Sequence, residues 1–347
     1  MSKTETIAPP VVAQTPPVVA PTPPVVAPTP ATGQESRLAQ QFGGHYTSGW
    51  MSSLPAAWTP YIQLARLHRP HGLIVVTLAH LFGILHAAFQ LQSSLRETLR
   101  VSAIIIAGSV FCNSGAHAWN DLVDAPIDAQ VERTKTRPIP RGAVTKTAAF
   151  IFAAAQAALA AACLLPLPPS TIVACVPSIV AILYYPFAKR QMFAPQLVLG
   201  ISIGLCVLVG SAAMGVEKPW YDASTLCLAA ATMLWTILFD TIYAHMDLVD
   251  DVKLGVNSFA VFIQGYARPV LFLLAVGLIT LLYSAGVYAG MGIAFNGIAV
   301  AGCLFCVGGI VTLLDLENRA SCGKWCIFGF RFTGISILTG LLLNYLV

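Results

Sequence analysis

The sequence predicts an all-α integral membrane protein, a bundle of nine transmembrane helices. Its 347 residues are 56% hydrophobic and only 10% charged, with a mean hydropathy of +0.74, whereas soluble domains carry about 25% charged residues. A helix needs about 20 apolar residues to cross a bilayer. Runs of this length recur near 73–91, 99–119, 145–166, 169–187, 193–214, 223–243, 268–289, 292–314 and 327–347.

The distribution of Lys and Arg supports this count and predicts the orientation. With nine spans, the N-terminus and the loops that follow even-numbered spans share one face, here called face A. Of the 19 Lys and Arg residues, only Arg96, Arg100 and Lys218 fall outside face A. Cytoplasmic loops of membrane proteins collect basic residues. We therefore expect face A and the N-terminus to be cytoplasmic.

The N-terminal segment is predicted to be separate from the membrane domain. It repeats PPVVAQT at 9–15 as PPVVAPT at 16–22 and 23–29, and proline at this density favours extended polyproline II over helix or sheet. We expect a disordered Pro-rich tail over residues 1–50 and a transmembrane domain over 51–347. The tail has little arginine before Arg37, which argues against a mitochondrial presequence.

Two clusters of oxygen-bearing side chains lie at the face A ends of the second and sixth spans. In each, a spacing of four residues stacks the side chains on one face while the helix continues. The clusters are Asn120, Asp124 and Asp128, then Tyr243, Asp247 and Asp251. Pro126 predicts that the first helix breaks near that point. Carboxylates at a membrane boundary are functional candidates by default.

The residue types around these clusters favour a metal-diphosphate site. Converging carboxylates repel each other unless cations lie among them, and Mg²⁺ takes a few carboxylates together with water and phosphate oxygens. Basic residues that can hold phosphate follow the first cluster, the fourth span and the second cluster. They are Arg133, Lys135, Arg137 and Arg141, then Lys189 and Arg190, then Lys253.

Several motifs, in order, resemble the UbiA prenyltransferase superfamily. They are Asn-Asp-x2-Asp-x3-Asp at 120–128, Tyr185-Pro with Lys189-Arg190, and Asp240-Thr-Ile-Tyr243-Ala with Asp247-x2-Asp-Asp251. The resemblance covers roughly residues 60–347. It implies a nine-helix bundle with a central cavity that is capped on the cytoplasmic side, and an enzyme that moves a prenyl group from its diphosphate to an aromatic acceptor.

The resemblance also implies roles for individual residues. The Mg²⁺ ligands would come from Asn120, Asp121, Asp124, Asp128, Asp247, Asp250 and Asp251. Of these, Asp124, Asp128, Asp247 and Asp251 are the expected catalytic residues. The diphosphate would be bound by Asn120, Arg69, Arg133, Arg137, Lys189, Arg190, Lys253 and Tyr243.

Two substrate classes are open within the family. One reading is a fungal meroterpenoid enzyme that transfers farnesyl from farnesyl diphosphate to an aromatic polyketide; the other is a 4-hydroxybenzoate polyprenyltransferase of ubiquinone synthesis. The arginine-poor tail favours the first, as do His245-Met246 and Asn257, where near relatives often carry glutamine and lysine. That reading places the protein in the endoplasmic reticulum or another endomembrane.

Other functional classes explain the pattern less well. A transporter would carry its ionisable groups near the bilayer centre, whereas these acids crowd one interface beside a basic rim. A scaffold would leave the two matched clusters without a purpose. The expected partners are an isoprenoid diphosphate, an aromatic acceptor and membrane lipids, and no nucleic acid is expected.

Overall fold

The computed structural model describes residues 49–131 and 133–347, and this part of the chain is entirely helical outside its loops. Nine of its helices are long and apolar enough to cross a membrane, which confirms the predicted bundle. They are α3 (His71–Gln90), α4 (Leu95–Asp128), α5 (Lys146–Leu164), α6 (Pro169–Gln191), α7 (Pro195–Ala213), α8 (Ala223–Ala244), α11 (Ala267–Ala289), the continuous η3 (Phe295–Val300) and α12 (Ala301–Leu313), and α13 (Arg319–Leu346).

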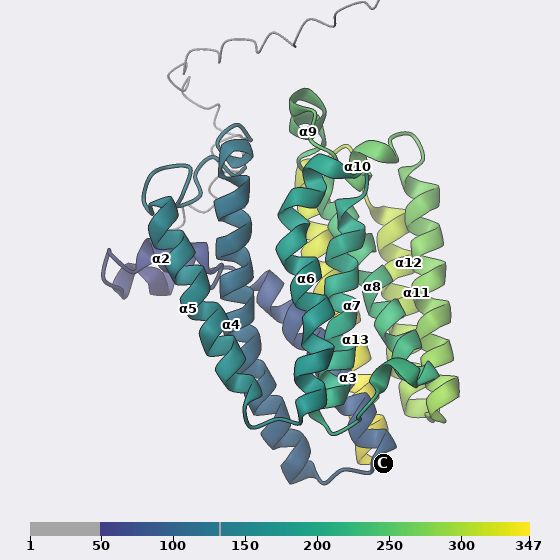
Figure 1. The fold of residues 1–347 in the computed structure, drawn as a ribbon. Helices are drawn as coiled ribbons and strands as arrows, with labels where there is room; N and C mark the ends of the chain where they lie inside the picture. Colours follow the sequence, from purple (N-terminus) through teal and green to yellow (C-terminus); the bar gives the residue numbers. More distant parts are fainter. Residues whose placement is uncertain (1–48, 132) are drawn as a thin grey trace, which may run out of the picture.

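Short helices precede or connect these spans. They are η1 (Gly49–Ser53), α2 (Thr59–Leu64), η2 (Pro219–Tyr221), α9 (Leu248–Leu254) and α10 (Phe259–Phe262). Figure 1 shows α9 and α10 at one end of the bundle and the C-terminus at the other. The repeats at 9–29 lie outside the described residues, so the tail remains a prediction.

Helix α4 corrects the expected break at Pro126. The helix runs through this proline to Asp128. Transmembrane helices tolerate an internal proline. In the same turn the Arg190 guanidinium donates to the carbonyl of Val123 at 3.0 Å. Asn120, Asp124 and Asp128 therefore stay on one continuous helix.

Helix α13 corrects the expected start of the last span at residue 327. It begins at Arg319, because the side chain of Asn318 caps it by accepting from the backbone N–H groups of Ala320 and Ser321 at 3.0 and 3.2 Å. The earlier start places Arg331 in the middle of a helix. Arg331 therefore lies well inside this helix and not four residues from its start.

The bundle has a tightly packed part and a looser one. Helix α7 packs on α3, α6 and α8, and α8 packs on α11, whereas α4 packs mainly on α5 and touches α6 little. In Figure 1, the α4–α5 pair accordingly stands apart from α6 and α7. The buried apolar core lies among α3, α7, α8, α11, α12 and α13. The looser seam between α4–α5 and α6–α7 leaves room inside the bundle.

Two glycines allow α3 and α7 to touch through their backbones. A Cβ on Gly83 would lie 1.9 Å from the carbonyl oxygen of Val207, and one on Gly210 would lie 2.1 Å from that of His80. Such contacts leave no space for any side chain. Small residues at helix interfaces allow this close approach in membranes.

We predict that Gly83→Ala lowers the melting temperature of the detergent-purified protein. The added methyl group must push two backbones apart, which costs about 1–3 kcal/mol as for other overpacked sites. Gly308→Ala is the matched control, because a Cβ at this helical glycine meets nothing within 4 Å and alanine favours the helix. Equal melting temperatures for the two variants would contradict the assigned contact.

Candidate functional site

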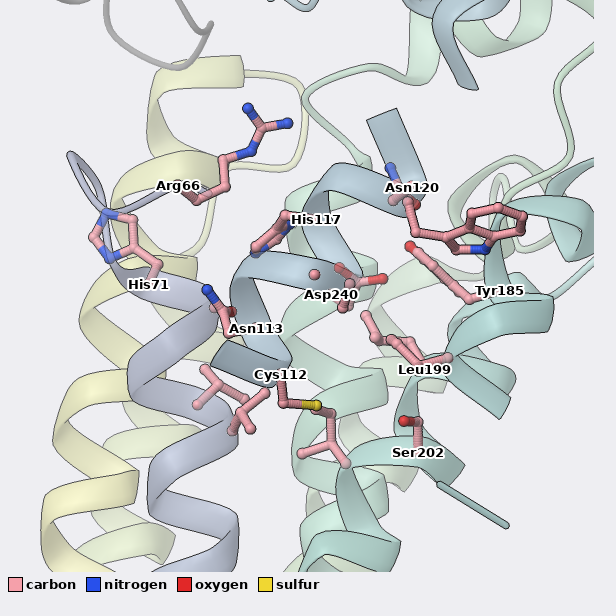
Figure 2. Close-up of a pocket in the computed structure, with 18 of the residues that line it drawn as sticks. Arg66, His71, Cys112, Asn113, His117, Asn120, Tyr185, Leu199, Ser202 and Asp240 are labelled. Carbon is pink, nitrogen blue, oxygen red and sulfur yellow. The ribbon is translucent and has the colours of Figure 1, made fainter. Parts of the chain in front are cut away.

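A cavity of about 780 Å³ lies in the looser seam of the bundle. Its walls come from α3, α4, α5, α6, α7, α8 and α13, with the segment before α3 and the loop after α4 at its mouth. The deeper wall is apolar and consists largely of alanine, isoleucine and cysteine side chains, whereas the mouth carries the charged residues. Figure 2 shows Cys112 below Asn113 and Asn120 on the α4 side.

The two predicted clusters meet at this mouth. On α4 a stripe with steps of four, three, four and four residues lines the cavity: Asn113, His117, Asn120, Asp124 and Asp128. The same steps recur in the second stripe: Thr236, Asp240, Tyr243, Asp247 and Asp251. The second stripe is not one helix, because α8 ends at Ala244 and α9 begins at Leu248. It nevertheless faces the cavity throughout.

The Arg133–Asp247 ion pair joins the loop after α4 to the segment between α8 and α9. The guanidinium donates to both carboxylate oxygens, with Nε to Oδ1 at 2.9 Å and Nη2 to Oδ2 at 2.6 Å, and Nη1 donates to the Tyr243 hydroxyl at 3.2 Å. Burial by itself would raise the pKa of Asp247, but the charge of Arg133 outweighs it and holds this pKa below its ordinary value. Asp247 is therefore a carboxylate.

Two acids of the first stripe each form an ion pair with a basic residue from another segment. Asp128 accepts from Arg137 at 2.7 Å, and Asp124 accepts from Lys189 of α6 at 2.5 Å. Asp251 forms no ion pair within the described residues. Burial and the nearby charge of Asp247 raise its pKa to about 7.

The other predicted site residues fall into two groups. Arg69 also lines the cavity, but four residues do not. Asp121 is not a lining residue itself, but it accepts from Arg66 at 2.7 Å and Arg137 at 3.2 Å, and both of these arginines line the cavity. Asp250 faces Arg319 at 3.4 Å.

The last two, Lys253 and Arg190, are exposed. Arg190 borders a smaller neighbouring cavity, and its Nη2 lies 3.8 Å from Asp124 Oδ1. These two cations therefore stand outside the mouth.

Four residues that line the cavity were not predicted from the sequence to be site residues. Asn113, His117 and Asp240 continue the two stripes deeper into the cavity. A helical step of three residues back from Asn120 and from Tyr243 reaches His117 and Asp240, and a further step of four reaches Asn113. Tyr185 lies where the Lys189 ammonium is 5.2 Å from its ring centroid. Figure 2 shows Tyr185, Asn120 and Asp240 in the same part of the pocket.

The donor set fits a divalent cation. Asn120 Oδ1 and Asp124 Oδ1 are buried, and neither has a hydrogen-bond partner among the described residues. Carboxylate and amide oxygens are ligands that Mg²⁺ accepts. Within the described residues no three acidic, histidine or cysteine side chains already form a metal cluster, because Arg and Lys separate the carboxylates.

The comparison with known proteins identifies the family. Residues 73–334 match the UbiA prenyltransferase family. The chain belongs to this family. It is therefore a multi-pass membrane prenyltransferase, as the two stripes at the cavity mouth indicated.

Named fungal relatives cover most of the chain. The prenyltransferase stbC of Stachybotrys bisbyi is 31% identical over 87% of this chain and 92% of its own length. The mitochondrial 4-hydroxybenzoate polyprenyltransferase of Schizosaccharomyces pombe is 33% identical over 80% and 77%. The DMOA farnesyltransferase nvfB of Aspergillus novofumigatus is 31% identical over 73% and 80%.

A solved structure has the same fold. The UbiA homolog from Archaeoglobus fulgidus bound to GPP and Mg²⁺ superposes with a TM-score of 0.65 at 17% identity, over 83% of this chain and all of that one. This similarity confirms the predicted UbiA-like bundle.

We predict that Arg133→Gln and Asp247→Asn each destabilise the protein strongly. Removing one partner of a buried pair leaves the other charge uncompensated, at a cost of about 3–5 kcal/mol, and these side chains are only 12% and 13% exposed. The double variant should lose less than the sum of the single losses. Melting temperatures in detergent measure this coupling.

The Arg319–Asp250 pair is the matched control. Its side chains are 28% and 18% exposed, so its coupling should be smaller, about 0–1 kcal/mol. Additive losses for Arg133 and Asp247 would show that the pair does not hold the mouth together.

Proposed function

We propose that this prenyltransferase uses Mg²⁺ to transfer a farnesyl group from its diphosphate to an aromatic polyketide in meroterpenoid biosynthesis. The observation that carries the proposal is the pairing of acids and bases at the mouth of one cavity with an apolar depth. The acids suit the metal, the bases suit the diphosphate, and the apolar wall suits the prenyl chain. The related Archaeoglobus structure contains both Mg²⁺ and a prenyl diphosphate.

In this mechanism the charged residues prepare the leaving group. Arg133, Arg137 and Lys189 would bind the phosphate oxygens. The stripe residues that would hold the metal are Asn120, Asp124, Asp128, Asp247 and Asp251. Bound Mg²⁺ supplies Lewis-acid neutralisation of the diphosphate charge. The allylic C–O bond then breaks and its electron pair stays on the departing oxygen. Fixed cations aimed at that oxygen stabilise the developing charge.

We assign two residues below the mouth to the steps that follow ionisation, in which the allylic cation is stabilised and the acceptor ring loses its proton. The ring of Tyr185 lines the cavity beside Lys189 and presents a face that attracts a cation. An electron-rich acceptor ring attacks the cation to form the new carbon–carbon bond, and the ring then loses a proton. Asp240 lines the same region and is our candidate for receiving that proton.

The finer substrate assignment follows from the relatives and the sequence together. One relative is named a farnesyltransferase and another a 4-hydroxybenzoate polyprenyltransferase, so the ubiquinone reaction is the second candidate. The arginine-poor tail and the residues at 245, 246 and 257 favour the meroterpenoid reaction. We also propose an endomembrane location with the cavity mouth on the cytoplasmic side.

A product analysis tests this proposal. Membranes containing the protein are incubated with Mg²⁺, farnesyl diphosphate and either methylated orsellinic acid or 4-hydroxybenzoate. Farnesylated orsellinic acid and released pyrophosphate are the expected products. Prenylation of 4-hydroxybenzoate alone would support the ubiquinone reaction instead.

We expect Asp124→Asn and Asp251→Asn to lower kcat by roughly a hundredfold or more, since each removes an ionised ligand from groups that stabilise transition-state charge. Asp250→Asn is the comparison, because Asp250 faces Arg319 away from the cavity and should cost far less. Turnover is measured with folded, purified variants. Wild-type turnover in Asp124→Asn would contradict the proposed mechanism.

The raised pKa of Asp251 predicts a pH-dependent requirement for Mg²⁺. Metal ligands must be deprotonated, and the pKa of this carboxyl is about 7, so protons compete with the metal below that pH. The half-saturating Mg²⁺ concentration should rise by about tenfold for each pH unit below 7 and level off above it. The Asp251→Asn variant should lose this dependence between pH 6 and 8.

The alanine-rich wall predicts a determinant of prenyl length. Ala157 of α5 lines the deep cavity, whereas its neighbour Ala158 does not. Ala157→Phe fills space that a long chain needs, so turnover of farnesyl relative to geranyl diphosphate should fall by about tenfold or more. Ala158→Phe is the control with an unchanged ratio. An unchanged ratio in Ala157→Phe would place the prenyl chain elsewhere.

A further inference from the structure

Helix α13 carries a cation in its interior that the proposed diphosphate chemistry does not use. Arg331 is about 18 Å along the helix from Arg319 at a rise of 1.5 Å per residue, and it is exposed where it lines the cavity. An ionisable residue inside a transmembrane helix is costly and marks a functional site by default. No ion pair found in residues 49–131 and 133–347 includes Arg331.

The neighbour of this guanidinium is a histidine at the start of α3. Arg331 Nη2 lies 3.4 Å from His71 Nδ1. Arginine can only donate, so Nδ1 accepts and the imidazole proton is on Nε2. A contact of 3.4 Å is longer than a good N–H···O or N–H···N bond. The guanidinium can therefore form a shorter, charge-assisted bond with an anion.

The wall that carries Arg331 leads toward the reaction region. Figure 2 shows His71 at one side of the pocket, then Asn113 and His117, with Asn120 and Asp240 beyond them. Gly72 makes this wall compact, because a Cβ there would lie 2.7 Å from His117 Nε2 and 3.1 Å from Asn113 Oδ1. Polar side chains thus connect Arg331 to the place where the prenyl carbon would be released.

The basic residues at the mouth and Arg331 on this wall suit different ligands. The carboxylates of the two stripes already form ion pairs with Arg133, Arg137 and Lys189. These three basic residues therefore belong to the proposed metal-diphosphate site. Arg331 lies on α13 with Ile327 and Phe330, which also line the cavity. A cation beside apolar and aromatic side chains suits a flat aromatic ring that carries a negative group. Arg69, two residues before His71, also lines the cavity and adds positive charge to this wall.

We propose that Arg331, supported by His71, binds the carboxylate of an aromatic acid acceptor and so selects acidic over neutral phenols. The proposal rests on the proposed function and adds the chemical character of the acceptor to it. The ring would extend from Arg331 past Asn113 and His117 toward Asn120. A neutral phenol would leave Arg331 without an anionic partner.

A comparison of two acceptors tests this subsite. Purified full-length protein with Mg²⁺ and farnesyl diphosphate is given orsellinic acid or orcinol, which is the same ring without the carboxylate. Arg331→Gln should lower the ratio of kcat/KM for the acid to that for orcinol by about tenfold or more, mainly through the KM of the acid. Arg331→Lys should restore part of the ratio.

Lys324→Gln is the matched control. It removes a cation from the same helix at a position that does not line the cavity, so the ratio should stay at the wild-type value. A loss of selectivity in this variant equal to that of Arg331→Gln would overturn the proposal, because a general charge effect would then explain both.

A binding measurement separates the subsite from the proposed reaction. Binding of both aromatics is measured on protein loaded with Mg²⁺ and farnesyl thiodiphosphate, which ionises slowly. If Arg331→Gln weakens binding of the acid alone while wild type prenylates neither aromatic with farnesyl diphosphate, the subsite stands and the proposed reaction fails. If wild type binds acid and orcinol equally, or if Arg331→Gln raises only the KM of farnesyl diphosphate, the subsite proposal is overturned.

Discussion

The mouth of the cavity depends on the compensation of buried carboxylates by basic residues from other segments. A carboxylate withdrawn from water is strongly destabilising unless a charged, hydrogen-bonded partner accompanies it. Asp124, Asp128 and Asp247 each have such a partner, in Lys189, Arg137 and Arg133 respectively. These contacts join α4, the loop after it, α6 and the α8–α9 segment. The same charges that hold the mouth together are those we assign to the substrate.

This pairing suggests how a metal and a diphosphate enter without leaving charges exposed to a low dielectric. With both ligands bound, the bases would pair with the phosphates and the carboxylates with the metal. Opposite charges would then remain in contact, so no isolated buried ion would be required. Asn120 Oδ1 and Asp124 Oδ1, which have no hydrogen-bond partners within the described residues, are ready first ligands.

Packing differences across the bundle create the space that this chemistry needs. Backbone contacts at Gly83 and Gly210 fix α3 against α7, which gives the charged mouth a firm base. Helices α5 and α6 bury little of their surface, and their small side chains border the apolar depth of the cavity. A rigid half beside a loosely packed half accommodates a long apolar chain under a well-positioned polar site.

The sequence by itself determined the nine spans, the family and both acidic stripes. Each of these depends on local properties: a run of apolar residues must cross the bilayer as a helix because its backbone must be satisfied internally, and a four-residue spacing places side chains on one face. Only the tertiary structure decided which charged residues share the mouth. Asp121 and Asp250 are close in sequence to the acids of the two stripes, yet neither lines the cavity: Asp121 accepts from Arg66 and Asp250 from Arg319.

The position of Arg331 was equally beyond the sequence. Counting apolar residues placed it four residues into the last span, whereas the Asn318 cap starts α13 earlier, and the fold brings Arg331 opposite His71 of α3. The rotation of a helix about its axis and its partner across a cavity depend on contacts between segments far apart in the chain. Hydropathy and spacing describe one segment at a time and therefore contain no information on them.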